Sequence, residues 1–236
     1  MHASHWLSKA RTGALIVALS LGLSGCFDLA QKVEIGRDGA GRYKVAITAG
    51  GIVGDALKEK PVTIEKHDHA VTTTRETDGK VTQTTVIDFK TLSDLRLSDE
   101  VMSLHVLEHS FFGLGPTHVR FRRTFLVGNA RKANADRMGE GDDEASTQIL
   151  AGMFGDHTYT FSVTVPGSIL RIAPVRLGGK RIEPQVSGDF YHGHTITWTM
   201  PLYRMLSETL LTFEVDFSAY GSFSDVQSAP EAATSL

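Results

Sequence analysis

The chain has 236 residues, of which 41% are apolar and 22% are charged, a composition that is ordinary for a globular protein. These values exclude a collagen-like chain, a polytopic membrane protein and a largely disordered one. The formal charge of −3 becomes more negative without the first 25 residues, which contain Lys9 and Arg11 and no acid. Nucleic-acid binding requires a basic surface, so this mildly acidic composition predicts no nucleic-acid partner.

Residues 1–25 are typical of a secretory signal peptide, because a basic segment precedes a short apolar run that ends in small residues. The apolar run is shorter than the roughly 20 residues of a membrane-spanning helix. It ends in Leu23-Ser24-Gly25-Cys26, which resembles the lipobox of bacterial lipoproteins, and Cys26 is the only cysteine. The resemblance implies cleavage before Cys26, a diacylglyceryl group on its thiol and a palmitate-type acyl chain on its amine. The alternative is an uncleaved N-terminal anchor.

Phe27 follows Cys26, where many lipoproteins retained at the inner membrane have aspartate. We therefore expect an extracytoplasmic protein that is lipid-anchored to a cell membrane, and to the outer membrane if the source is Gram-negative. We expect the first strand to begin after Gln31, which leaves residues 27–31 as a tether. Five residues span at most about 18 Å, so the folded body should lie close to the lipid surface.

Apolar and polar residues alternate along much of the chain after Cys26, which is the pattern of strands with one buried face. The alternation is regular in residues 159–165, 195–200 and 211–217. Three dipeptides of the kind that forms tight hairpin turns separate such segments: Asp38-Gly39, Asp78-Gly79 and Gly178-Gly179. The predicted fold class is therefore α+β, dominated by antiparallel β-sheet of nine to eleven strands, with one or two short helices.

The helices are predicted at residues 144–154 and, from a weaker pattern, at residues 52–58. A threonine-rich hairpin within residues 71–89 is polar near its tip, so we expect it to project or to form a solvated edge. The predicted organisation is a signal peptide at residues 1–25, a single β-rich domain at residues 26–221 and a disordered tail at residues 222–236.

Besides the lipobox, five stretches carry a recognisable pattern: residues 89–95, 119–124, 163–167, 194–198 and 213–217. With these stretches and the lipobox, the chain resembles the LppM-type bacterial lipoproteins, a family of poorly known function. The resemblance implies a β-rich extracytoplasmic domain that an N-terminal lipid holds to a membrane. It brings no established catalytic residues.

His105-Val106-Leu107-Glu108-His109 matches the H-x-x-E-H motif of one class of zinc peptidases. In that motif two histidines bind zinc and the glutamate acts as base, which requires a helix that places them on one face. Glu183 is the acid whose spacing suits a third ligand. The flanking sequence indicates a strand instead, on which the histidines and the glutamate would point to opposite sides. The alternative to a zinc site is two partly exposed histidines on a sheet face.

Two further pairs of histidines, His67/His69 and His192/His194, have the H-x-H spacing that places both rings on one face of a strand. Each pair could contribute to a metal site, but the sequence suggests no third ligand for either. Gly193 favours a turn for the second pair. We therefore assign no metal ligands and predict no cofactor.

Arg120, Arg122 and Arg123 form a basic cluster on a predicted strand. They could contact anionic lipid headgroups, or they could form a solvated strand face that is paired with acids. Arg123 is in phase with the apolar residues of its strand. Either a bulge shifts the register there, or this arginine enters the interior.

The sequence lacks a nucleophile elbow, a phosphate-binding loop and a dinucleotide fingerprint. We expect a non-enzymatic envelope lipoprotein that binds lipid or another apolar ligand, or that acts as a scaffold for an envelope protein. The apolar ligand is suggested by a wide apolar sheet face with one convincing helix to cover it. The alternative function is a zinc-dependent hydrolase that uses His105, Glu108 and His109.

Overall fold

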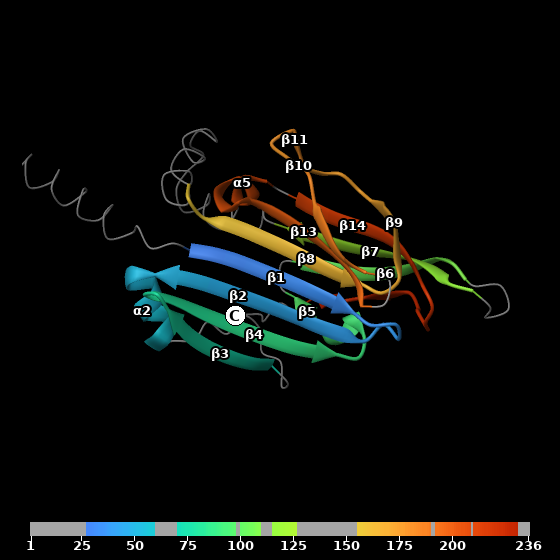
Figure 1. The fold of residues 1–236 in the computed structure, drawn as a ribbon, viewed down its shortest axis with the longest axis horizontal. Helices are drawn as coiled ribbons and strands as arrows, with labels where there is room; N and C mark the ends of the chain where they lie inside the picture. The colour runs from blue at the N-terminus through green and yellow to red at the C-terminus, as the bar shows by residue number, and fades with distance from the viewer. Residues whose placement is uncertain are drawn as a thin grey trace, which may run out of the picture.

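The computed structural model describes residues 27–59, 70–97, 100–109, 115–126, 155–189, 192–208 and 210–230. Two antiparallel-rich sheets carry most of this part of the chain (Figure 1). The signal peptide, Cys26, the pair His67/His69 and the helix predicted at residues 144–154 lie outside the described residues.

The larger sheet has seven strands in the order β12-β13-β8-β1-β2-β4-β3. These strands are β1 (Phe27–Ile35), β2 (Gly41–Gly50), β3 (Ala70–Thr77), β4 (Lys80–Phe89), β8 (Thr158–Val165), β12 (Gln185–Asp189) and β13 (Gly193–Pro201). All neighbours pair antiparallel except β1 and β8, which run parallel. The threonine-rich β3 is an edge strand, as the sequence predicted.

The smaller sheet has five strands in the order β15-β6-β7-β14-β9. They are β6 (Glu100–Glu108), β7 (Thr117–Leu126), β9 (Ser168–Ile172), β14 (Leu210–Ala219) and β15 (Val226–Gln227). Two minor pairs complete the described strands: β10 (Val175–Leu177) with β11 (Lys180–Ile182), and β5 (Arg96–Leu97) with β16 (Ala229–Pro230). A 3₁₀ turn at Leu92–Asp94 precedes β5.

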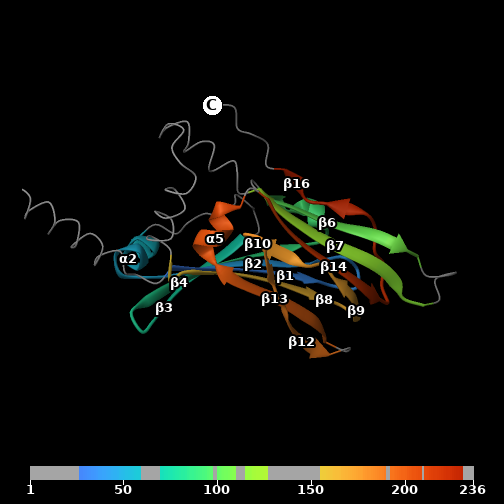
Figure 2. The same cartoon turned by 90° about the horizontal axis from the view of Figure 1, so that it is seen from above.

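The two sheets pack face to face, and one apolar core joins them (Figure 2). Phe161 on β8 lies between the sheets, with its ring centroid 4.6 Å from that of Phe213 on β14 and 5.8 Å from that of Trp198 on β13. All three rings are fully buried. The apolar face that suggested an apolar ligand is thus covered by the second sheet, so this reason for such a ligand is lost.

The three predicted hairpin turns are confirmed. Asp38-Gly39 lies between β1 and β2, and Asp78-Gly79 lies between β3 and β4 with φ of 53° and 71°. Gly178 and Gly179 connect β10 and β11 with φ of 55° and 74°. Positive φ at both central residues is the geometry of the tight turns that match the twist of the flanking strands.

The described residues contain two short α-helices, so the β-rich prediction is confirmed, although α+β describes the fold only loosely. Helix α2 (Gly51–Glu59) confirms the helix predicted at residues 52–58. It follows β2 directly and buries Gly54 and Leu57 against the sheet. Helix α5 (Leu202–Ser207) connects β13 to β14 and was not predicted from the sequence. No helix in the described ranges is long and apolar enough to cross a membrane.

The prediction of a disordered tail from residue 222 is wrong for residues 222–230. Phe223 is buried and packs edge-on against Phe217, with ring centroids 5.7 Å apart. Ser228 exchanges two hydrogen bonds with Met102: its backbone N–H donates to the Met102 carbonyl (2.8 Å), and its Oγ accepts from the Met102 N–H (2.9 Å). The segment therefore continues the five-stranded sheet and covers its edge.

The two ends of the sandwich differ in what they carry. β1 begins at Phe27, beside the end of β2 and helix α2, and α5 lies at the same end (Figure 1). The tether predicted at residues 27–31 is therefore wrong, because these residues are already paired with β2 and β8. The turn after β1, the turn after β8 and the end of β14 meet at the opposite end.

Candidate functional site

The H-x-x-E-H segment lies on a strand, so the helix that a zinc peptidase needs is absent there. His105, Val106 and Glu108 pair with Arg120, Val119 and His118 of β7, with a bulge between Val106 and Glu108. The Glu108 carboxylate lies 3.0 Å from His118 Nδ1 and points to a neighbouring strand. The zinc-peptidase interpretation fails on this geometry.

Glu183, the predicted third ligand, lies just after β11, where its carboxylate pairs with the Arg181 guanidinium at 2.7 Å. His192 pairs with the carboxylate of Asp189 at 2.9 Å in the turn before β13, and His194 lies on β13. Within the described ranges, no three histidine, cysteine, aspartate or glutamate side chains are grouped closely enough to hold a metal ion.

Arg123 enters the interior, which decides between the two alternatives that the sequence left open. The register of β7 with β14 is continuous through Arg123, so no bulge moves the side chain outward. Its guanidinium is fully buried, hydrogen-bonded to Glu100 and Gln31, and donates to the Tyr159 hydroxyl at 2.6 Å. A headgroup contact by Arg123 is therefore excluded.

The buried polar network around Arg123 joins the two sheets. Tyr43 on β2 donates to the Glu100 carboxylate on β6 (2.7 Å) and accepts from Gln31 Nε2 on β1 (2.9 Å). Tyr159 on β8 donates to Gln31 Oε1 (2.6 Å). Burial raises the pKa of the Tyr159 hydroxyl to about 12, and burial also raises the pKa of Tyr43 well above its ordinary value of 10.0. Both tyrosine hydroxyls thus keep their protons around neutral pH and can donate these hydrogen bonds.

Arg120 and Arg122 lie on the opposite face of the same strand, where they pair with acids on β14. Arg120 binds Asp216 with two hydrogen bonds of 2.7 and 3.0 Å, and Arg122 binds Glu214 at 2.6 and 2.8 Å. Arg171 on β9 reaches the same two carboxylates from the other side. The interpretation as a strand face paired with acids fits this arrangement, and the guanidinium groups are already engaged.

Asp216 should make the stability of this group of ion pairs depend on pH. The hydrogen bond from Arg120 is the main cause of a pKa below the ordinary value of 3.8 for this carboxyl. A carboxyl whose pKa is lower in the folded than in the unfolded state stabilises the folded state at pH values above its ordinary pKa. This contribution is lost as the pH falls through the folded-state pKa. We therefore expect Asp216→Asn to lower the free energy of unfolding at neutral pH and to lose this effect in strongly acid solution. Urea unfolding across that range measures it.

The matched control is Asp88→Asn, which removes an ion pair of similar length between exposed side chains on the other sheet. Asp88 accepts from Arg42 at 2.7 Å, and both side chains are more than half exposed. Exposed pairs contribute about 0–1 kcal/mol. A difference between Asp216→Asn and the wild type that stays constant with pH, or that grows in acid, would contradict the assignment.

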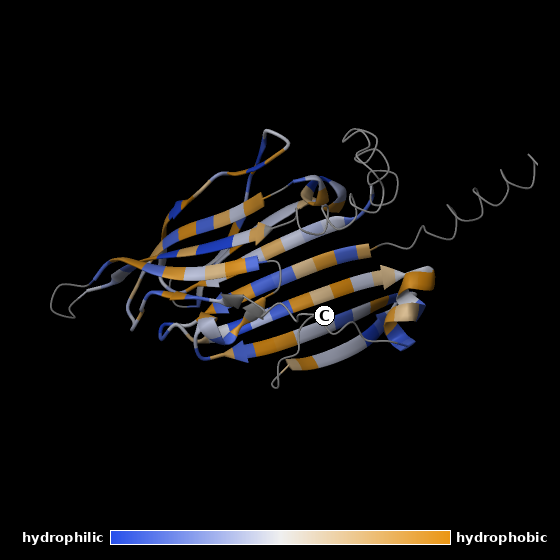
Figure 3. Ribbon diagram, turned by 180° about the vertical axis from the view of Figure 1, so that it is seen from behind, coloured by the Kyte–Doolittle hydropathy of each residue, from blue (hydrophilic) through white to orange (hydrophobic). Residues whose placement is uncertain are grey.

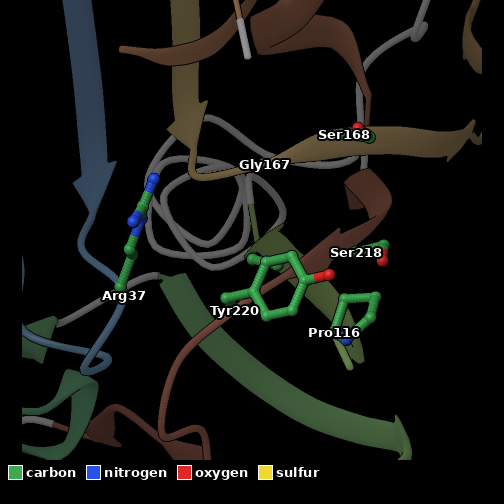
Figure 4. A pocket seen from close by; sticks show the side chains of 7 residues that line it. Arg37, Pro116, Gly167, Ser168, Ser218 and Tyr220 are labelled. Carbon is green, nitrogen blue, oxygen red and sulfur yellow. The ribbon is translucent and has the colours of Figure 1, made fainter. Parts of the chain in front are cut away.

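A hollow of about 490 Å³ lies at the end of the sandwich away from the start of β1 (Figure 4). It is lined by Arg37, Pro116, Gly167, Ser168, Ser218, Ala219 and Tyr220. These residues come from four connections that are far apart in sequence. Gly167 has a φ of 73°, and a Cβ there would overlap the Ser218 carbonyl oxygen, so a glycine permits the close approach of these segments.

The lining of the hollow is mainly apolar, with a few polar groups at its edge. The Ser222 N–H donates to the Arg37 carbonyl at 2.9 Å, which holds the turn after β1 against the segment that follows β14. The Arg37 side chain is exposed and forms no ion pair with a described residue. In the view of Figure 4 the Tyr220 ring lies between Arg37 and Pro116, and Ser168 and Ser218 are the other polar residues of the lining. Sequence analysis did not identify this site, because no local motif links its segments.

Comparison with known proteins gives one distant structural neighbour. No family model matches the chain, and no curated protein matches it. The chain is similar in fold to the solved folded domain of the Mycobacterium tuberculosis LppM protein, with a TM-score of 0.40 and 9% sequence identity. The similarity covers 83% of this chain and 91% of that chain. It is a weak relationship of fold, and it leaves membership of the family a prediction.

Proposed function

We propose that this chain is an envelope lipoprotein, acylated at Cys26, whose β-sandwich acts as a non-enzymatic binding or scaffolding domain at the membrane surface. The observation that carries the proposal is that the first strand of the domain begins directly after the predicted lipidation site. The lipobox ends at Cys26, and strand β1 begins at the next residue, Phe27. The anchored residue thus precedes the sandwich without a spacer.

The first residues after Cys26 are held firmly in the sheet, which supports a body fixed at the lipid surface. The Phe27 N–H donates to His157 Nδ1 at 2.7 Å, and Asp28 accepts from the backbone N–H and hydroxyl of Thr158 at 3.0 and 2.7 Å. Nine residues of β1 lead from this point to the opposite end. At about 3.3 Å per residue the strand spans roughly 30 Å, so the hollow near Arg37 would face away from the membrane.

The proposal places ligand binding on the surface, because the inner faces of both sheets are filled with side chains. The hollow lined by Arg37, Ser168, Ser218 and Tyr220 is the candidate contact site for an envelope partner, because it combines a mainly apolar lining with a few polar side chains. The interior suits an apolar ligand poorly, since aromatic rings and the Arg123 network occupy it.

Substitution of Cys26 tests the anchor. Expressed as the full chain in a bacterium that processes lipoproteins, the wild type should be found in the membrane fraction with the added mass of acyl chains. Cys26→Ala should accumulate as an unacylated, largely uncleaved precursor, because the thiol that receives the lipid is missing. Intact mass spectrometry of both proteins measures cleavage and acylation directly.

Ser24→Ala is the matched control, because it changes the same segment but keeps a small residue there. It should be cleaved and acylated like the wild type. If Cys26→Ala reaches the same membrane at the same mature mass as the wild type, the lipoprotein assignment is wrong.

A further inference from the structure

We propose that helix α2 is a second membrane contact, which inserts Ile52 and Val53 into the lipid surface beside the acylated Cys26. The inference rests on the proposed lipid anchor and adds a surface of the folded domain to it. The occupant of this surface is the bilayer that the anchor itself enters.

The position of α2 follows from the pairing of the first two strands. Phe27, the residue after Cys26, pairs with Ala49 at the end of β2, and α2 begins two residues later at Gly51. Paired Cα atoms lie about 5 Å apart, and three further residues reach at most about 11 Å. Ile52 therefore lies within roughly 16 Å of the residue that follows the anchor, on the same end of the sandwich.

Helix α2 exposes an apolar patch next to its charged residues Asp55, Lys58 and Glu59. Ile52 is 72% exposed, Val53 is 37% exposed, and Ala56 one turn later is also exposed. Residues three and four apart share one face of a helix, so these three side chains form a continuous patch. The opposite side of the helix is already used, because it packs Gly54 and Leu57 on the sheet. Figure 3 shows the apolar residues of α2 at this end of the fold.

The charges of α2 and its ion-pair partner Glu76 comprise one lysine and three acids, Asp55, Glu59 and Glu76, and are therefore net negative. Lys58 pairs with Asp55 at 3.5 Å and with Glu76 of β3 at 3.0 Å. A contact with lipid would therefore depend on the apolar side chains rather than on anionic headgroups. A short apolar turn of this kind binds a membrane weakly alone, but the acyl chains of Cys26 would hold it at the surface.

Tryptophan fluorescence in vesicles tests the contact. The sequence contains two tryptophans, one in the signal peptide and Trp198, which is fully buried. The full lipidated Ile52→Trp protein would be reconstituted into vesicles of phosphatidylethanolamine and phosphatidylglycerol with brominated acyl chains. We expect bromine to quench its added emission at least about twofold more strongly than that of Leu170→Trp, whose site on β9 is 52% exposed and remote from α2.

The outcomes separate the inference from the proposed anchor. If acylated, vesicle-bound Ile52→Trp is quenched no more than Leu170→Trp, the contact by α2 is wrong and the anchor stands. If the purified protein carries no acyl chains and does not associate with vesicles, the anchor fails and the inference fails with it. Near-ultraviolet circular dichroism of both variants checks that the fold is unchanged, which is expected because both sites are exposed.

Discussion

Replacement of Glu100 by alanine is expected to lower the free energy of unfolding by about 3–5 kcal/mol. The substitution removes the carboxylate partner of Arg123, whose guanidinium is fully buried between the sheets. It also removes the acceptor of the Tyr43 hydroxyl. An unpaired buried charge costs far more than the pair contributed, because the Arg123 guanidinium stays out of water without its counter-charge. Urea unfolding at neutral pH measures the loss.

Two further variants show that the cost comes from the unpaired charge. In Glu100→Leu combined with Arg123→Met the charges disappear together, and most of the stability should return. The recovery should be incomplete, because Gln31 and Tyr159 lose their partner Arg123. Glu183→Ala removes an exposed pair with Arg181 and should cost no more than about 1 kcal/mol. If Glu100→Ala costs as little as Glu183→Ala, the network does not hold the sheets together.

The strands and turns could be predicted because their signals are local. In residues 159–165 every second side chain is apolar, and these are the ones that β8 buries. Asp78-Gly79 predicts a tight turn because few other dipeptides accept positive φ at both positions. These features depend on neighbouring residues and need no knowledge of the partner strand.

The pairing between distant segments could not be predicted, because it depends on contacts that no local pattern records. β1 and β8 are parallel neighbours although more than 120 residues separate them. Residues 222–230 have a weak pattern, and their order depends on distant groups: β5 and β6 pair with their backbone, and Phe217 packs against Phe223. The acids that pair with Arg120 and Arg122 are on β14, and nothing near the arginines indicates them.

The candidate sites, too, could be predicted only where a local pattern indicates them. The H-x-x-E-H motif needs a helix, and the alternation around it correctly indicated a strand, so the local pattern decided against the motif. The hollow near Arg37 arises where loops of both sheets meet, and its residues form no motif. Arg123 was recognised as unusual from its phase alone, but its partners Gln31, Glu100 and Tyr159 required the fold.

Replacement of Phe161 by alanine is the second substitution expected to cost about 3–5 kcal/mol. The ring is fully buried at the centre of the cluster that joins the sheets, with the rings of Trp198 and Phe213 beside it. The centroid of the Phe161 ring also lies 4.3 Å from the guanidinium carbon of Arg123. The substitution therefore removes a cation–π contact from a buried charge. The surrounding strands are held by their backbone hydrogen bonds and cannot collapse fully into the cavity. The loss in free energy of unfolding therefore stays large. Thermal and urea unfolding measure the change.

Thr160→Ala is the matched control, because Thr160 is the preceding residue of the same strand and points to the outer face. Its hydroxyl lies 3.5 Å from that of Thr199 on β13, which is a weak contact in an exposed position. The change should stay within about 0.5 kcal/mol. Phe161→Leu should fall between the two variants, since it keeps part of the buried volume but loses the aromatic face. Equal stability of Phe161→Ala and Thr160→Ala would mean that the sheets do not share one core at Phe161.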